Sequence, residues 1–155
     1  LDYFVINDEL IHYYGEEENI CVPEGIRVIH DYAFAPKHSN ESHILSVDIP
    51  EGVETIGECA FKWAYKLEKL VLPSTINEIG KDNFKESYKM KKLVIGFEPR
   101  DAKYAAYLID KVFDIRCLAR LYLERKITAS DLFLVELKKV NLLAKRMYFR
   151  SDANE

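Results

Sequence analysis

The sequence predicts an α/β fold: a short solenoid with a parallel strand ladder, a β-hairpin at its N-terminal end and three helices at its C-terminal end. The first observation is a segment that occurs three times, with prolines at Pro23, Pro50 and Pro73 and a phenylalanine eleven residues after each. A period of twenty-odd residues is typical of solenoids, in which each repeat buries its apolar face against its neighbours. The second observation is that a helical spacing of apolar residues replaces the repeat after Gly96.

The N-terminal stretch has the composition of a hairpin. Residues 3–6 and 10–14 are rich in β-branched and aromatic residues, and the polar residues 7–9 between them suit a short turn. A solenoid with an open end exposes both its core and a strand edge. We therefore expect this hairpin to cover the first repeat.

Each repeat contributes one strand, which has the apolar-x-x-apolar-x-apolar pattern of a leucine-rich repeat. The copies are Ile44-x-x-Val47-x-Ile49, Leu67-x-x-Leu70-x-Leu72 and Met90-x-x-Leu93-x-Ile95, with a weaker Ile20-x-Val22 before the first proline. Alternate residues of such a strand point into the core, and those between them face outward. The proline after each strand ends the ladder, because it has no N–H to donate.

The segment after each proline makes the turn of the repeat. Gly25 and Gly52 permit the chain to turn, whereas the third copy has Ser74-Thr75 at this place. Gly57 and Gly80 indicate either a positive φ or a close approach of two backbones. The phenylalanines that close the segment are expected to stack as an aromatic column; they are Phe34, Phe61 and Phe84.

The C-terminal part is predicted to form three helices that cap the solenoid. The first begins at Pro99 and runs to about residue 112, and the second is capped by Asp114 and runs to about residue 125. The third runs to about residue 149 after a near capping box of Thr128 and Asp131. Its apolar stripe is expected to pack on the last strand and consists of Leu132, Phe133, Leu137, Val140, Leu143, Ala144 and Met147. The predicted domains are 1–96 and 97–155.

Composition narrows the function classes. The chain has 155 residues and a net charge of −4. Residues 1–96 carry a net charge of −7, and residues 97–155 carry a net charge of +3. Such mild charges do not indicate a nucleic acid partner, and no apolar run is long enough to span a membrane. Three cysteines without paired spacing indicate free thiols, packed as small apolar side chains. The chain begins at Leu1 without a methionine, and we expect it to be a piece of something longer.

No arrangement of residues predicts catalysis. The sequence has no Gly-rich phosphate loop, Gly-x-Ser-x-Gly elbow, His-Glu-x-x-His helix or Cys-x-x-Cys pair. His38, Glu41 and His43 lie close in sequence, but a polar loop offers a metal ion little second-shell support. We therefore predict a protein that is not an enzyme and has neither a metal site nor a cofactor.

The outward residues of the strands are the candidate binding site. They form one row of Asn19, Ser46, Lys69 and Lys92, and a second row of Cys21, Asp48, Val71 and Val94. Their mixed polar and apolar character suits a protein or a glycan partner.

The repeat resembles the BspA-like leucine-rich repeat of bacterial surface antigens, over about residues 3–96. The unit of that family reads L-x-x-V-x-I-P-x-x-V-x-x-I-G-x-x-A-F, and residues 44–61 keep its proline, glycine and phenylalanine at the same offsets. The third copy departs from it at Ser74-Thr75 and at Asn83, where alanine is expected. The resemblance implies a non-catalytic protein associated with adhesion or protein binding, at the cell surface or secreted. Unpaired cysteines fit the cytoplasm equally well.

Two functions are therefore open. The leading hypothesis is a binding module that presents the strand face to a protein or glycan. The alternative is that the repeats are a scaffold and that the C-terminal helices are a dimerisation or signalling element.

Overall fold

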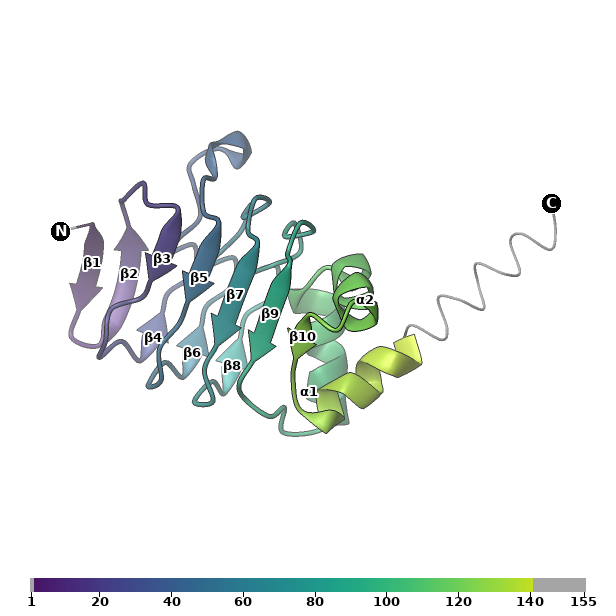
Figure 1. Ribbon diagram of the computed structural model, residues 1–155. Helices are drawn as coiled ribbons and strands as arrows, with labels where there is room; N and C mark the ends of the chain where they lie inside the picture. Colours follow the sequence, from purple (N-terminus) through teal and green to yellow (C-terminus); the bar gives the residue numbers. More distant parts are fainter. Residues whose placement is uncertain (1, 141–155) are drawn as a thin grey trace.

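The computed structural model describes residues 2–140 and shows a solenoid of two strand layers with helices at its C-terminal end (Figure 1). One sheet has the order β1–β2–β4–β6–β8 and the other β10–β9–β7–β5–β3. The first sheet consists of β1 (Tyr3–Ile6), β2 (Glu9–Tyr13), β4 (Val28–Ile29), β6 (Thr55–Ile56) and β8 (Glu78–Ile79). The second sheet consists of β3 (Asn19–Cys21), β5 (Ser46–Asp48), β7 (Lys69–Leu72), β9 (Lys92–Ile95) and β10 (Ile127–Thr128).

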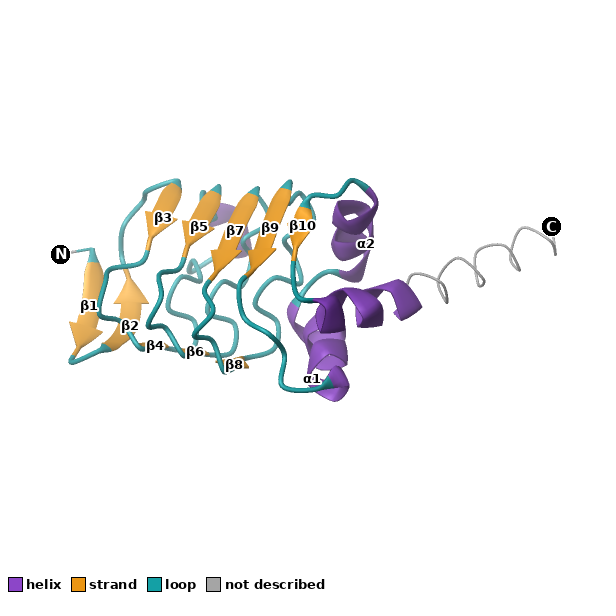
Figure 2. Ribbon diagram, turned by 60° about the horizontal axis from the view of Figure 1, so that its bottom comes forward, coloured by secondary structure: helices purple, strands orange, loops and turns teal. Residues whose placement is uncertain are grey.

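The strands pair in the register that the repeat predicts. β1 and β2 form the antiparallel hairpin, and every other pairing in the two sheets is parallel. Equivalent residues of successive repeats lie side by side: Val47 pairs with Leu70, which pairs with Leu93. Figure 2 shows β3, β5, β7, β9 and β10 in one layer and the short strands β4, β6 and β8 in the other. Buried apolar residues of both layers form one core. The predicted leucine-rich-repeat solenoid, with its N-terminal hairpin cap and helical C-terminal cap, is confirmed.

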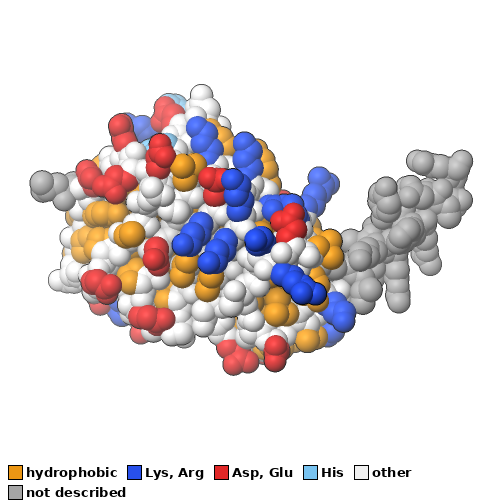
Figure 3. Space-filling model, in the orientation of Figure 1, with side chains coloured by type: hydrophobic (Ala, Val, Ile, Leu, Met, Phe, Trp, Pro, Cys, Tyr) orange, Lys and Arg blue, Asp and Glu red, His pale blue; other side chains and the backbone are white. Residues whose placement is uncertain are grey.

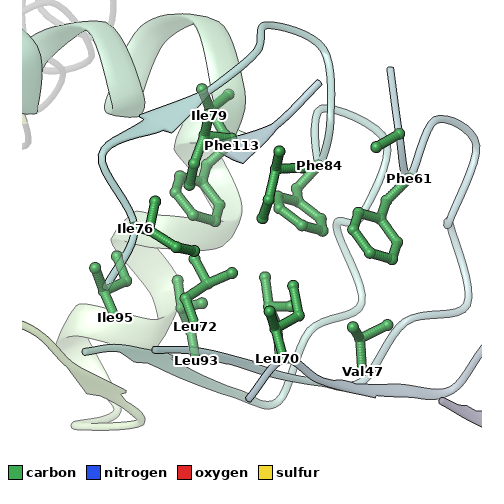
Figure 4. Packing of buried hydrophobic residues seen from close by; sticks show 14 of the residues in the cluster. Val47, Phe61, Leu70, Leu72, Ile76, Ile79, Phe84, Leu93, Ile95 and Phe113 are labelled. Carbon is green, nitrogen blue, oxygen red and sulfur yellow. The ribbon is translucent and has the colours of Figure 1, made fainter. Parts of the chain in front are cut away.

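A column of stacked rings runs through the core. The ring centroids of Phe34 and Phe61 are 4.8 Å apart, those of Phe61 and Phe84 are 5.4 Å apart, and Phe113 continues the stack at 5.5 Å. At the other end, Tyr13 of the hairpin covers Phe34 at 5.2 Å. Figure 4 shows Phe61, Phe84 and Phe113 in one row above the aliphatic residues of the strands. The predicted aromatic column therefore has five members instead of three.

The glycines of the turns have two different roles. Gly25 and Gly52 have φ angles of 88° and 107°, in the left-handed region that glycine favours. Gly57 and Gly80 are instead required by close backbone contacts. A Cβ atom on Gly57 would lie 2.5 Å from the backbone nitrogen of Asp31, and one on Gly80 would lie 2.4 Å from that of Glu58.

The third repeat departs from the pattern because its side chains replace backbone groups. The hydroxyl of Thr75 accepts from the Gly52 N–H at 3.0 Å and donates to the Val53 carbonyl at 2.7 Å. The side chain of Asn83 is fully buried and accepts from the Phe61 N–H at 3.0 Å, where the backbone carbonyl of Ala60 serves in the previous repeat. Its amide group also donates to two carbonyls, those of Gly57 and Gly80. Asn83 thus ties its repeat to the preceding one with two of its three hydrogen bonds.

The three helices lie close to where the sequence predicts them, with one correction. α1 (Ala102–Tyr107) is capped by Asp101 and continues as the π-helical turn η2 (Leu108–Val112), and α2 (Ile115–Leu123) is capped by Asp114 as predicted. The predicted cap of the third helix at Thr128 is wrong. Thr128 pairs with Val94 in β10, and residues 131–140 are helical after Ser130. The unpaired edge of β9 binds this segment as a strand.

The C-terminal part continues the solenoid as one further coil built from other elements. Phe113 takes the place of the repeat phenylalanine, and the carbonyls of Lys111 and Val112 accept from Asp82 and Phe84 at 2.8 Å each. α2 stands where the repeats have a loop, and β10 supplies the strand. The core of the solenoid is thereby closed at the level of Phe113.

Side chains cap the other sheet at its last strand, β8. The hydroxyl of Tyr104 accepts from the Ile79 N–H at 3.0 Å, and the hydroxyl of Tyr107 donates to the Ile79 carbonyl at 2.8 Å. Arg100 lies over the ring of Tyr104 and donates to the carbonyl of Asn77 at 3.1 Å. These bonds occupy groups of an edge strand that would otherwise be open to another chain.

The predicted apolar stripe of the third helix is partly buried within this chain. Phe133 and Leu137 are fully buried in the common core, and Leu134 and Val140 pack against it. Leu143, Ala144 and Met147 lie outside the described residues. The predicted boundary near Gly96 lies between the strand β9 and α1.

We predict that the two predicted domains depend on each other. A chain that ends at Gly96 exposes the ring of Phe84 and the edge of β9, so it should be insoluble or markedly less stable than the chain of residues 1–155. The fragment 97–155 should show no cooperative thermal transition in circular dichroism, because short helices take most of their stability from packing. A cooperative transition of that fragment would contradict the cap and support an independent helical domain.

Asn83 should be intolerant of an isosteric acid. Asn83→Asp replaces the amide donor by an oxygen that faces two carbonyls, and we expect a loss of about 2 to 4 kcal/mol in the free energy of unfolding. The new carboxyl is buried, so its folded pKa lies above the unfolded one. The penalty should be full at neutral pH and should shrink, relative to wild type at the same pH, as the pH falls through the folded pKa. Denaturant titrations measure the free energy of unfolding of both Asn83→Asp and Asn83→Ala. The second variant removes the side-chain hydrogen bonds without adding a charge, and we expect it to lose about 1 to 3 kcal/mol.

Candidate functional site

The candidate binding face is the outer surface of β3, β5, β7 and β9. The register aligns Asn19, Ser46, Lys69 and Lys92 as one row, and Cys21, Asp48, Val71 and Val94 as the second row. Ser46, Val71 and Val94 are half-buried, and the other members are exposed. The hydroxyl of Ser46 donates to the side-chain oxygen of Asn19 at 2.7 Å, so these two neighbours hold each other in place. The strand pairings bring all the predicted site residues onto one surface.

The structure adds a fifth strand to this face, which sequence reasoning missed. β10 aligns Ile127 with Leu93 and Thr128 with Val94. Thr128 therefore extends the second row, and Lys126, one residue before Ile127, extends the first row beside Lys92. The only signal for this strand in the sequence is the β-branched pair Ile127-Thr128, which is too short to show a period.

The first row ends in three consecutive lysines, which we call the lysine row: Lys69, Lys92 and Lys126. Adjacent strands are about 4.8 Å apart, and like charges at directly opposite positions of neighbouring strands are unfavourable. Among residues 2–140, the ion pairs include none of these three lysines. In Figure 3, Lys and Arg side chains gather over β7, β9 and the neighbouring loops, whereas Asp and Glu predominate toward the N-terminal end.

Two grooves flank the face. The first, of about 650 Å³, runs along the C-terminal ends of the strands and contains the second row from Cys21 to Val94. Its charged lining is acidic and consists of Glu24, Asp48 and Glu51. Hydrogen bonds from Ser74 lower the pKa of Glu51, which favours its ionised form. This groove is therefore the acidic side of the face.

The second groove, of about 590 Å³, lies at the N-terminal ends of the strands and is mainly basic. It is lined by Leu45, Lys66, Glu68, Tyr88, Lys89, Lys91 and Arg120. Glu68 is paired with Lys91, and Arg120 is held by the carbonyl of Met90 and by Glu124. Tyr88 is 53% exposed and offers an aromatic surface beside these cations. The face thus has charges of opposite sign along its two long sides.

The three cysteines are free and differ in exposure. Cys59 and Cys117 are buried, and burial raises the pKa of the Cys117 thiol, which disfavours the thiolate. Cys21 is exposed on the face, so our prediction that all three thiols are packed is wrong for this residue. Within residues 2–140 no three His, Cys, Asp or Glu side chains gather as a set of metal ligands. None of the helices in the same part of the chain is long and apolar enough to cross a membrane.

Comparison with known families agrees with this architecture. The sequence model of the BspA-type leucine-rich repeat region, which has six copies, matches residues 5–105 and again residues 27–129. The chain belongs to the family of BspA-type leucine-rich repeat proteins. The match ends just after β10 and so extends further than the resemblance over residues 3–96. No curated protein matches the chain.

The family assigns the chain to the protein-binding repeat modules, which are typically non-enzymatic scaffolds.

The lysine row should limit the stability of the protein. In Lys92→Glu, a carboxylate stands between Lys69 and Lys126 in place of a third like charge. We expect the free energy of unfolding to rise by about 0.5 kcal/mol, because opposite charges on neighbouring strands are favourable and like charges are not. The double variant Lys69→Glu/Lys92→Glu should stay within about 1 kcal/mol of wild type. Denaturant titrations at low and high salt measure both, and a clear loss of stability in Lys92→Glu at low salt would contradict the repulsion.

Proposed function

We propose that the protein binds a protein partner with the strand face formed by β3, β5, β7, β9 and β10, and that it acts as an adhesion or recognition module without catalytic activity. The observation that carries this proposal is the alignment of outward side chains in two continuous rows over parallel strands. Such a surface is rigid, since every strand is held by its neighbours. A rigid surface loses little conformational entropy when it binds.

The size of the face supports a modest interface. Five strands span about 19 Å between the outermost two at about 4.8 Å per step. This width alone is small for a standard interface, which buries about 800 Å² per partner. The two flanking grooves enlarge it on both sides, so an extended segment that enters either groove has more surface to contact.

A glycan partner is the competing form of the same proposal. Sugar-binding surfaces use aromatic rings for stacking. Among the described residues that line the two grooves, Tyr88 of the basic groove is the one exposed aromatic residue. The half-buried Val71 and Val94 offer apolar contacts that suit amino-acid side chains better. The face therefore favours a polypeptide.

The alternative function, a dimerisation or signalling role for the C-terminal helices, has less support. Phe133 and Leu137 of the proposed stripe are fully buried within the chain itself. Packing on the solenoid thus occupies the residues that a helical partner would need.

An unbiased peptide selection tests the proposal. A display library of random twelve-residue peptides is selected on the chain of residues 1–155, and the recovered clones are then measured on two variants. Ser46→Arg/Val71→Arg places two large side chains at the centre of the face. Thr55→Arg/Asn77→Arg makes the same change in charge around the other sheet and serves as the matched control. We expect the clones to bind the control as they bind wild type and to lose about tenfold or more in affinity on the face variant. Clones that bind the face variant as well as wild type would contradict the proposal.

A further inference from the structure

The strand face separates basic and acidic side chains, and this arrangement indicates the chemistry of a partner. The lysine row lies over β7, β9 and β10, and the acidic groove of Glu24, Asp48 and Glu51 lies at the C-terminal ends of the strands. Val71 and Val94, which are half-buried and apolar, line this same groove, and Asp48 is the neighbour of Val71 in the second row. The face therefore has a basic row and, two residues further along each strand, a row that passes from the acidic Asp48 to the apolar Val71 and Val94.

We propose that the partner contributes an extended, acidic polypeptide segment that runs across β7, β9 and β10, with its carboxylates on the lysine row and its apolar side chains on the valines of the second row. This inference rests on the proposed function and names the chemistry of its partner. The two rows are two residues apart on each strand, which is about 7 Å, and a segment with alternating acidic and apolar residues presents both kinds of group within that reach.

The first argument is the unpaired charge. Three ammonium groups on adjacent strands repel one another, and within residues 2–140 the ion pairs leave all three without a carboxylate. Two of the three belong to repeats, and the third, Lys126, comes from the C-terminal coil and falls in the same line. An acidic segment provides the counter-charges that this surface lacks.

The second argument excludes a uniform polyanion. A nucleic acid or a sulfated glycan carries one sign of charge along its whole length, and the acidic groove beside the valines repels it. A uniform polyanion gains nothing from Val71 and Val94, while a polypeptide does.

The third argument concerns how far the bound segment reaches. The lysine row continues at the N-terminal ends of the strands into the basic groove, where Lys66 and Lys89 lie beside the exposed ring of Tyr88 and the side chain of Leu45. A further acidic or apolar residue of the segment fits there. Because Lys126 belongs to the C-terminal coil and is placed by β10, the lysine row is complete only when that coil is in place.

The experiment uses a labelled twelve-residue peptide of alternating glutamate and valine, whose binding to the chain of residues 1–155 is followed by fluorescence anisotropy. We expect affinity to fall as the salt concentration rises, and binding to be lost when glutamine replaces glutamate. The variant Lys92→Glu/Lys126→Glu should weaken binding about tenfold or more. The control Lys81→Glu/Lys103→Glu makes the same change in charge at exposed lysines outside the face and should change binding by less than about twofold.

A charge swap tests the site most directly. A peptide of alternating lysine and valine should bind Lys92→Glu/Lys126→Glu better than it binds wild type, and circular dichroism confirms that each variant is folded. Lys126→Gln alone should weaken the acidic peptide, because Lys126 is part of the row. Equal effects of the face variant and its control, or no effect of Lys126→Gln, would overturn the proposal.

Two competing occupants give distinct results. If a heparin octasaccharide or a twelve-nucleotide single strand of thymidine binds more tightly than the peptide and with the same lysine dependence, the site takes polyanions and the proposal fails. If sedimentation shows a dimer that Lys92→Glu/Lys126→Glu abolishes, the occupant is a second copy and the proposal fails. If selected clones depend on the face but carry no excess of acidic residues, the proposed function stands and this inference alone falls.

Discussion

The stacking of equivalent residues from coil to coil is the constraint on which this structure depends. Phe34 packs on Phe61, and Phe61 packs on Phe84, so each of these rings is covered by the equivalent ring of a neighbouring repeat. A column of this kind has no natural end, because its last member always exposes one face. The molecule solves this problem twice. Tyr13 of the hairpin covers the first ring, and Phe113 of the C-terminal coil covers the last.

The C-terminal solution also shapes the binding face. Closing the core at Phe84 requires a further coil, and that coil must satisfy the edge of β9 with a strand. β10 is this strand, and it adds Lys126 and Thr128 to the two rows of outward residues. A part of the chain that stabilises the solenoid therefore also widens the surface on which we place the partner. Stability and binding are linked through one short strand.

The lysine row has no role in the fold that the contacts reveal. Its members face solvent on neighbouring strands, and their mutual repulsion opposes folding. By contrast, two polar side chains of the core have clear structural roles: Asn83 is fully buried and forms three hydrogen bonds, and the buried hydroxyl of Ser87 donates to the Ala64 carbonyl. Proteins accept local costs of this kind at functional sites. The contrast between these hydrogen-bonded core residues and a row of like charges is the reason to place recognition on the face.

The sequence by itself determined the repeat, the strand register and most of the face, because identical spacing forces equivalent residues into equivalent places. Phe61 and Gly52 could be assigned from their offsets alone, and Asp114 from its place before a helical period. Tertiary structure decided β10, the bonding of Asn83 and the place of Lys126 in the lysine row. The β10 segment is only two residues long and has no readable period. It becomes a strand because β9 offers an unpaired edge, just as Asn83 is needed because a backbone N–H of the preceding repeat lies opposite its side chain. Such requirements arise between coils, and they exist only once the chain is folded.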